Sequence, residues 1–185
     1  WLYLKTVESQ GLMGVNYRFV NLILNGEKMG IYAMEEHFSK HLIERCQKRA
    51  GVIIGFEDSR LWEVFWGDTR NQDINELYTQ LPIKFYNNSS NEKLTTEYNT
   101  ASRLLEKLQF EEITAKKVFN SEQLGKFLAI CHLWGAQHNL IVNNIKFYFN
   151  PVTAQLQPIA FDACPNLTNF SPYQYFTNDF PEHSF

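Results

Sequence analysis

The pattern of apolar and polar positions in the amino-terminal part predicts a short helix followed by a β-hairpin. Residues 2–10 have the character of a helix that stops at Gly11. Residues 17–24 form an apolar run, Asn25-Gly26 tolerates positive φ, and residues 30–34 resume the strand pattern. The polar residues after Gly26 allow a loop longer than the two-residue Asn-Gly form, but the pattern indicates a hairpin in either case.

A helix and a third strand are predicted next. Residues 36–49 place apolar side chains at helical spacing with charges between them, which predicts an amphipathic helix ended by Gly51. Residues 52–56 predict a third strand. The periodicity fails over residues 57–91, which we interpret as a long loop with short ordered pieces.

The carboxy-terminal part predicts two helices and a second hairpin. Residues 94–108 carry apolar side chains on one face of a helix, whereas the helix predicted at 121–134 is apolar nearly all round and is expected to be central. Residues 145–150 and 156–161 are short apolar runs of strand character, and residues 151–154 can form the turn between them.

Two polar residues bracket this second hairpin. Asn144 opens it and Asp162 closes it, and the outer ends of an antiparallel hairpin lie side by side. An amide oxygen and a carboxylate at that end are hard ligands suited to magnesium. The alternative is purely structural, because Asn is common in turns and an Asp after a strand often caps the next element.

Composition and charge exclude several classes of protein. The chain has 185 residues, of which 44% are hydrophobic, so it can bury a core and is not a disordered tail. The formal net charge of −3, from 17 Lys and Arg against 20 Asp and Glu, argues against nucleic-acid binding. The sequence has no run of 18 apolar residues, the length that predicts a membrane-spanning helix. Three widely spaced cysteines argue against a disulfide framework.

Two blocks of the sequence carry a family resemblance. Residues 25–36 fit the pattern N-G-x-x-x-G-x-Y-x-x-x-E, residues 143–148 fit N-N-x-x-F-Y, and residues 158–162 fit P-x-x-x-D. In this order the blocks resemble the signatures of the spore coat protein H (CotH-like) kinase family, and the resemblance spans most of the chain.

The resemblance implies an α+β fold, a diverged protein-kinase-like fold with two lobes. We expect residues 1–86 to form an amino-terminal lobe, truncated at its start, with a β-hairpin and a helix. The turn-forming cluster within residues 87–93 predicts a linker. Residues 94–185 are then expected to form a helical lobe that carries the site on the hairpin at residues 144–162.

The implied activity is an ATP-dependent protein kinase that uses Mg²⁺ or Mn²⁺ and transfers the γ-phosphoryl group to Ser or Thr of a protein. Asp162 and Asn144 match the metal-binding residues of the family. Glu36 matches the Glu that, by analogy with kinases, steadies a phosphate-contacting Lys in cofactor binding. Without the resemblance, Glu36 is a solvated carboxylate in the first turn of a helix. Family analogy also suggests a cell-envelope or extracellular setting.

The chain departs from the kinase pattern at two places. In D-x-x-x-x-N the catalytic Asp precedes the metal-binding Asn by five residues, and here that position is Asn139, whose amide cannot accept a hydroxyl proton. His138 is adjacent and is the candidate base, although a lone His after an apolar helix is often structural. No Lys stands in the third strand, which has Gly55 instead, so a phosphate-contacting Lys is expected upstream.

Two functions therefore remain open from the sequence. One is an active, atypical phosphotransferase that uses Asn144 and Asp162 for the metal and His138, or a relayed water, as the base. The other is a degenerate pseudokinase that serves as a nucleotide-binding or protein-interaction module of a larger surface protein. Asn139 favours the second. A hydrolase lacks support, because no G-x-S-x-G, H-E-x-x-H or Gly-rich phosphate loop occurs.

Overall fold

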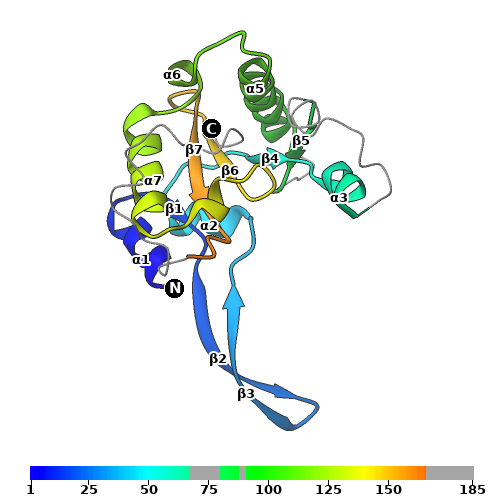
Figure 1. The fold of residues 1–185 in the computed structure, drawn as a ribbon, viewed down its shortest axis with the longest axis vertical. Helices are drawn as coiled ribbons and strands as arrows, with labels where there is room; N and C mark the ends of the chain where they lie inside the picture. Colours follow the sequence, from blue (N-terminus) through cyan, green and yellow to red (C-terminus); the bar gives the residue numbers. More distant parts are fainter. Residues whose placement is uncertain (67–79, 88–90, 166–185) are drawn as a thin grey trace.

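The protein has an α+β architecture, shown in Figure 1 as a computed structural model that describes residues 1–66, 80–87 and 91–165. Its helical elements are α1 (Leu2–Ser9), α2 (Lys40–Arg45), α3 (Ser59–Trp66), α5 (Glu92–Gln109), α6 (Ala115–Val118), α7 (Ser121–Leu133) and the 3₁₀ turn η1 (Gln137–Leu140). Its strands are β1 (Met13–Gly14), β2 (Tyr17–Leu24), β3 (Glu27–Glu35), β4 (Ile53–Phe56), β5 (Ile83–Phe85), β6 (Lys146–Asn150) and β7 (Gln155–Ala160).

Five strands form one mixed sheet in the order β1-β7-β6-β4-β5. β1 pairs with β7 in parallel, and the other neighbours are antiparallel. The register places Lys84 of β5, Gly55 of β4, Lys146 of β6 and Ile159 of β7 in one row across the sheet. Because directly opposite residues point to the same face, the side chains of this row share one side of the sheet.

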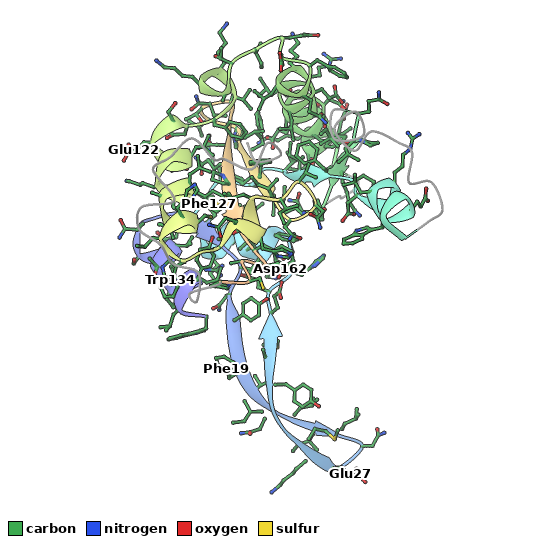
Figure 2. All side chains as sticks on the ribbon, in the orientation of Figure 1. Phe19, Glu27, Glu122, Phe127, Trp134 and Asp162 are labelled. Atoms are coloured by element: carbon green, nitrogen blue, oxygen red, sulfur yellow. The ribbon has the colours of Figure 1, made fainter. Side chains whose placement is uncertain are left out.

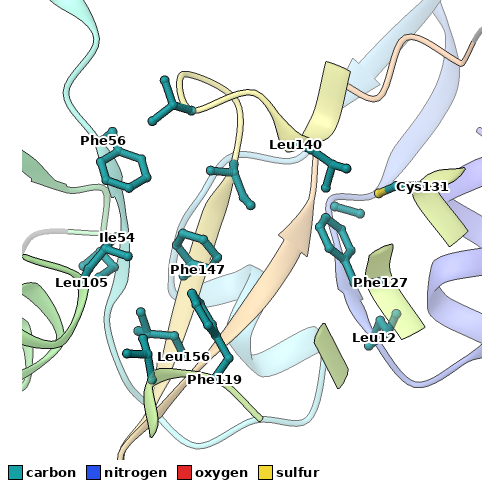
Figure 3. Packing of buried hydrophobic residues seen from close by; sticks show 14 of the residues in the cluster. Leu12, Ile54, Phe56, Leu105, Phe119, Phe127, Cys131, Leu140, Phe147 and Leu156 are labelled. Atoms are coloured by element: carbon teal, nitrogen blue, oxygen red, sulfur yellow. The ribbon is translucent and has the colours of Figure 1, made fainter. Parts of the chain in front are cut away.

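Helices α1, α5 and α7 cover one face of the sheet and form the larger core with it. Figure 3 shows Phe127 and Cys131 of α7 and Leu105 of α5 in the same buried cluster as Ile54 and Phe147 of the sheet. All five residues have no exposed surface. Full burial of a large apolar side chain contributes roughly 1.5–3 kcal/mol, so this layer fixes the helices that precede the second hairpin.

The opposite face is covered by the short helix α2 and the residues before it. Leu42 of α2 and Phe38 pack in one buried cluster with Ile53 of β4 and Tyr148 of β6. The ring of Phe38 also lies edge-on to the ring of Phe161, with a centroid distance of 4.9 Å. This contact anchors the chain just before Asp162, at the exit of β7.

The first hairpin is a two-stranded ribbon that extends away from the body (Figure 1). Leu24 pairs with Glu27, so Asn25 and Gly26 alone form the turn, with φ values of 52° and 89°. The longer loop considered for this hairpin is therefore wrong, because Asn and Gly meet the positive φ of a two-residue turn without help. Every residue of β3 is exposed.

Several other predicted elements are confirmed. The helix predicted at residues 2–10 is α1, that at 94–108 is α5, and that at 121–134 is α7. Asn120 caps α7 by accepting a hydrogen bond from the backbone N–H of Gln123 at 3.1 Å. The third strand is β4, and the second hairpin is β6 and β7 with its turn at residues 151–154.

One prediction is corrected, and the structure specifies another. The helix expected at residues 36–49 is only α2, because its N-cap is Ser39 and Gln47 takes a left-handed φ of 54° directly after Cys46. The segment at residues 57–91 was expected to be a long loop with short ordered pieces, and α3 and β5 are two such pieces, while residues 67–79 and 88–90 lie outside the described residues. β5 has three residues, with Lys84 at its centre, which is too short to show a strand period.

The main sheet combines strands from both sides of residues 87–93, since β4 and β5 precede this segment and β6 and β7 come after it. Asn87 itself bonds to β4, where its Oδ1 accepts from the backbone N–H of Ile53 at 2.7 Å. The division into two lobes with a linker at residues 87–93 stays a prediction. None of the helices that the structure describes combines the length and apolar character needed to cross a bilayer.

Candidate functional site

The η1 turn and the open end of the β6–β7 hairpin bring three polar side chains together. Nδ1 of His138 lies 3.0 Å from Nδ2 of Asn144 and 3.6 Å from Oδ2 of Asp162. The structure thus places Asn144 and Asp162 at one mouth of the hairpin, as the sequence predicts, with His138 between them. In Figure 2, Asp162 lies at the side of the body from which the β2–β3 hairpin projects.

The His138 ring contacts one backbone carbonyl and the side-chain amide of Asn144. Its Nδ1 lies 2.8 Å from the carbonyl oxygen of Asp162. Nδ1 thus faces both this carbonyl acceptor and the Nδ2 donor of Asn144, so the ring nitrogen that carries the proton depends on the tautomer. The side chain is 42% exposed, which allows a proton donor to reach the ring.

Asn144 is fixed by the same turn. Its Nδ2 donates to the carbonyl oxygen of His138 at 3.0 Å and lies 3.4 Å from Nε2 of that ring. Asn144 is 6% exposed, so its amide is ordered by the surrounding chain. None of the hydrogen bonds described for this amide uses Oδ1, which leaves an oxygen to bind a ligand.

Asp162 comes after β7 in an unusual backbone conformation. Its φ is 43°, in the left-handed region that Asp and Asn tolerate better than other residues with a Cβ. The side chain is 49% exposed, in contrast to the buried strand before it. Backbone conformations of this kind cluster at functional sites, where the surrounding structure maintains them.

These donors fit a magnesium ion that arrives with a nucleotide better than a resident metal ion. Among the described residues, no group of three or more His, Cys, Asp or Glu side chains could hold a metal. Asn144 and Asp162 offer one amide oxygen and one carboxylate. Mg²⁺ keeps several waters and is commonly bound by one or two protein oxygens together with substrate phosphates.

Asn139, at the position of the kinase catalytic Asp, points into the core. It has no exposed surface, and its Oδ1 accepts from the Tyr3 hydroxyl at 2.8 Å and from the backbone N–H of Phe161 at 3.1 Å. Burial raises the pKa of Tyr3 well above its ordinary range, so this hydroxyl remains a donor. Asn139 therefore links α1 to the exit of β7 and lies apart from the exposed ring of His138.

Glu36 has a different partner from the one expected. Its carboxylate binds the guanidinium of Arg45, with Nη2 2.6 Å from Oε2, and accepts from the backbone N–H of Asn16 at 3.0 Å. Arg45 also donates to the carbonyl oxygen of Gly14 at 2.6 Å. This network ties the base of the hairpin to α2 and β1. Contact between Glu36 and a phosphate-binding Lys stays a prediction.

Lys146 is a residue of this region that sequence reasoning missed. It is 3% exposed, although it lies two residues after Asn144 in the strand β6. Burial lowers the pKa of its amine to about 8, while the carboxylate of Asp58 acts in the opposite direction. The signal was present in the sequence, because a lone Lys interrupts an apolar strand, but its burial depends on Gly55 in another strand.

One comparison with known proteins identifies a related family. The family model described as CotH kinase protein matches residues 2–171, which is most of the chain. No curated protein matches the chain.

Proposed function

Because the chain belongs to the CotH kinase protein family, we propose that it binds ATP with Mg²⁺ or Mn²⁺ and transfers the γ-phosphoryl group to a Ser or Thr hydroxyl of a protein. The observation that supports this proposal most is the meeting of Asn144 and Asp162 at one ring nitrogen of His138. Phosphoryl transfer depends mainly on positioning and charge neutralisation, and these side chains provide both.

In this proposal Asn144 Oδ1 and the Asp162 carboxylate hold the metal ion of the metal–nucleotide complex. When bound, the ion supplies positive charge against the phosphate oxygens. The chain contributes a fixed arrangement, because the Asn144 amide is anchored on the His138 carbonyl and Asp162 is set by its left-handed backbone. Two oxygens held in this way need little reorganisation when the nucleotide binds.

His138 is the group proposed to accept the proton of the substrate hydroxyl. In the tautomer in which Nδ1 donates to the Asp162 carbonyl, the lone pair for this step is on Nε2, which lies 3.4 Å from Nδ2 of Asn144. General-base catalysis of this type contributes typically about 10²–10⁴-fold to the rate. Asn139 cannot take this part, since its amide is neutral and its oxygen already accepts two hydrogen bonds.

A second candidate function is a nucleotide-binding or protein-interaction module without transfer activity, a pseudokinase within a cell-envelope or extracellular protein. The observation that favours it is Asn139, because the usual carboxylate is replaced by a fully buried amide. The kinase and the nucleotide-binding form of this module both use Asn144 and Asp162 for the metal–nucleotide complex, and they differ in whether the bound nucleotide gives up its γ-phosphoryl group. A module that acts through protein interaction alone needs no nucleotide.

Binding is tested by thermal melting with and without Mg-ATP. A ligand present at 100 times its dissociation constant stabilises the folded chain by about 2.7 kcal/mol. Asp162→Asn is the variant of choice, because Asn also tolerates the left-handed conformation and only the charge is lost. Glu44→Gln, which removes an exposed carboxylate from α2, is the matched control.

Transfer is tested with γ-labelled ATP and a generic protein acceptor. The kinase proposal predicts incorporation that falls about 100-fold or more in Asp162→Asn and in His138→Gln, and is unchanged in Glu44→Gln. Mg-ATP binding without incorporation supports the second candidate. Incorporation that survives Asp162→Asn contradicts the metal assignment.

A further inference from the structure

Two lysines flank one glycine on the sheet face that also carries Phe38 and α2. Gly55 of β4 is directly opposite Lys84 of β5 on one side and Lys146 of β6 on the other. Opposite residues of antiparallel strands share a face, so the side chains of both lysines lie on one side of the sheet. The row therefore places two cations on the same side, one on each side of a glycine.

The space for Lys146 depends on Gly55. A Cβ at position 55 would lie 2.7 Å from Cδ of Lys146, 3.1 Å from a ring carbon of Tyr86 and 3.2 Å from the carbonyl oxygen of Ile145. The stem of Lys146 therefore occupies the space that a side chain at position 55 would need. The third strand, β4, has Gly55 where a Lys was expected, and the absence of a side chain at Gly55 leaves room for Lys146 of the neighbouring strand β6.

The amine of Lys146 is directed toward the candidate site. It donates to the carbonyl oxygen of Asn143 at 2.6 Å, so it turns back to the end of β6 where Asn144 lies. It is also 5.1 Å from the ring centroid of Tyr86, and the amine of Lys84 is 5.5 Å from the same centroid. Both amines thus lie beside the ring of Tyr86.

Lys146 and Lys84 differ in their counter-charges. Lys84 is 3.0 Å from the carboxylate of Glu57, and both of these side chains are partly exposed. Within the described part of the chain, no carboxylate lies within ion-pair distance of the Lys146 amine. One backbone carbonyl uses only one of its three donor hydrogens. Among the described residues, no second acceptor is hydrogen-bonded to this amine, so two of its donors, beside Asn144, are available to an anion.

We propose that Lys146, assisted by Lys84, binds phosphate oxygens of the nucleotide that Asn144 and Asp162 hold through its metal ion. This inference rests on the proposed nucleotide binding and adds the cations that contact the phosphates. The lysine expected on the third strand is supplied by the strands on both sides of it. Ammonium groups bind phosphate as point charges, so the role requires a lysine amine and not a particular strand.

The first test measures Mg-ATP affinity of the full chain by isothermal titration calorimetry. Lys146→Met keeps the length and apolar stem of the side chain and removes its charge, and it is expected to weaken binding by about tenfold or more. Lys84→Met is expected to have a smaller effect in the same direction. Lys126→Met is the matched control, because Lys126 is an exposed lysine paired with Glu122 on α7. Its affinity should equal that of the wild type.

Gly55→Ala is a second variant that changes no charge. The added methyl group displaces the Lys146 stem, so Mg-ATP affinity should fall although every ionisable group is retained. Equal affinity in the wild type, Lys146→Met and Lys84→Met overturns this inference and leaves the proposed function intact. Absence of Mg-ATP binding by the wild type overturns both.

A labelling experiment covers the case in which Lys146→Met does not fold. An acyl-phosphate derivative of ATP reacts with an amine beside the terminal phosphate. The amine nitrogen forms an amide with the acyl carbon, the acyl–oxygen bond breaks, ATP leaves and the amine loses a proton. Mass spectrometry of the wild-type chain should find the acyl group on Lys146 or Lys84, with protection by excess ATP. ATP-protected labelling that is confined to other lysines overturns the inference.

Discussion

Replacing Asn139 by Asp restores the carboxylate of the kinase pattern, and the structure predicts that it destabilises the protein without creating a base. The side chain of Asn139 is fully buried, and its Oδ1 already accepts from the Tyr3 hydroxyl and the backbone N–H of Phe161. Its Nδ2 has no hydrogen-bond partner among the described residues. In Asn139→Asp the second oxygen replaces this Nδ2 and finds no donor there.

The magnitude depends on opposing effects on the pKa of the new carboxyl group. Burial raises the pKa of a carboxyl by up to 3–5 units, and the two donors to Oδ1 reduce that shift, so we take about 2 units above the unfolded value of about 3.9. One unit corresponds to about 1.36 kcal/mol, which gives a loss of about 2.7 kcal/mol once the group is ionised. Among the described residues, the titratable group bonded to this side chain is Tyr3, which in turn contacts Cys131, and neither brings a positive charge.

The sign of the pH dependence is fixed by the raised pKa. When the pKa of a group is higher in the folded state than in the unfolded state, the protein becomes less stable as pH rises through these two pKa values. Asn139→Asp should therefore match the wild type near pH 4 and fall below it progressively between about pH 4 and pH 6. At pH 8 the loss corresponds to a Tm lower by about 5–10 °C for a chain of this size.

Calorimetric melting of both proteins at pH 4 and pH 8 measures this effect. Asn99→Asp, the same change on the exposed face of α5, is the control and should stay within about 0.5 kcal/mol of the wild type at both pH values. Phosphoryl transfer by Asn139→Asp should not exceed that of the wild type. A variant that is as stable as the wild type at pH 8 and gains transfer activity would refute the buried, structural role of Asn139.

Two further changes test the framework around the site. Glu36→Gln should lower the free energy of unfolding by about 1–2 kcal/mol, because the partly buried carboxylate binds Arg45 and a backbone N–H. The control Glu44→Gln, in an exposed pair, should lower it by less than about 0.5 kcal/mol. Urea unfolding measures both variants, and equal effects would contradict the role of the Glu36–Arg45 pair. Phe127→Ala should lower the free energy of unfolding by about 3–5 kcal/mol, because Phe127 is fully buried between α7 and the sheet. Leu133→Ala, on the exposed face of α7, should be nearly neutral. A loss below about 1 kcal/mol for Phe127→Ala would contradict the packing of α7.

The elements that local chemistry determines could be predicted from the sequence. Asn25-Gly26 specifies a two-residue turn, and Asn120 specifies the start of α7, because both act through contacts within a few residues. The helix predicted from residue 36 begins only at Lys40. The carboxylate of Glu36 binds Arg45 and the backbone N–H of Asn16 instead, and apolar periodicity does not reveal these contacts. The parallel pairing of β1 with β7 is likewise a contact between distant segments.

In the candidate site, too, the features set by nearby residues could be predicted and those set by distant residues could not. Asn144 and Asp162 could be placed together because one hairpin joins them, and hairpin ends meet by geometry. The burial of Asn139 depends on Tyr3, which is 136 residues away in the sequence. The burial of Lys146 depends on Gly55, and nothing near Lys146 in the sequence indicates a glycine opposite it.

The most direct test of the metal site is paramagnetic broadening of the His138 ring signals by Mn²⁺ with ATP in a histidine-labelled chain, with His138→Gln used for assignment. Because the Nδ1 of His138 lies within 3.6 Å of side-chain atoms of both Asn144 and Asp162, its ring signals should broaden at substoichiometric Mn-ATP. The broadening should disappear in Asp162→Asn. Ring signals of His138 that stay sharp while the chain binds Mn-ATP would show that the metal lies elsewhere and would contradict the proposed site.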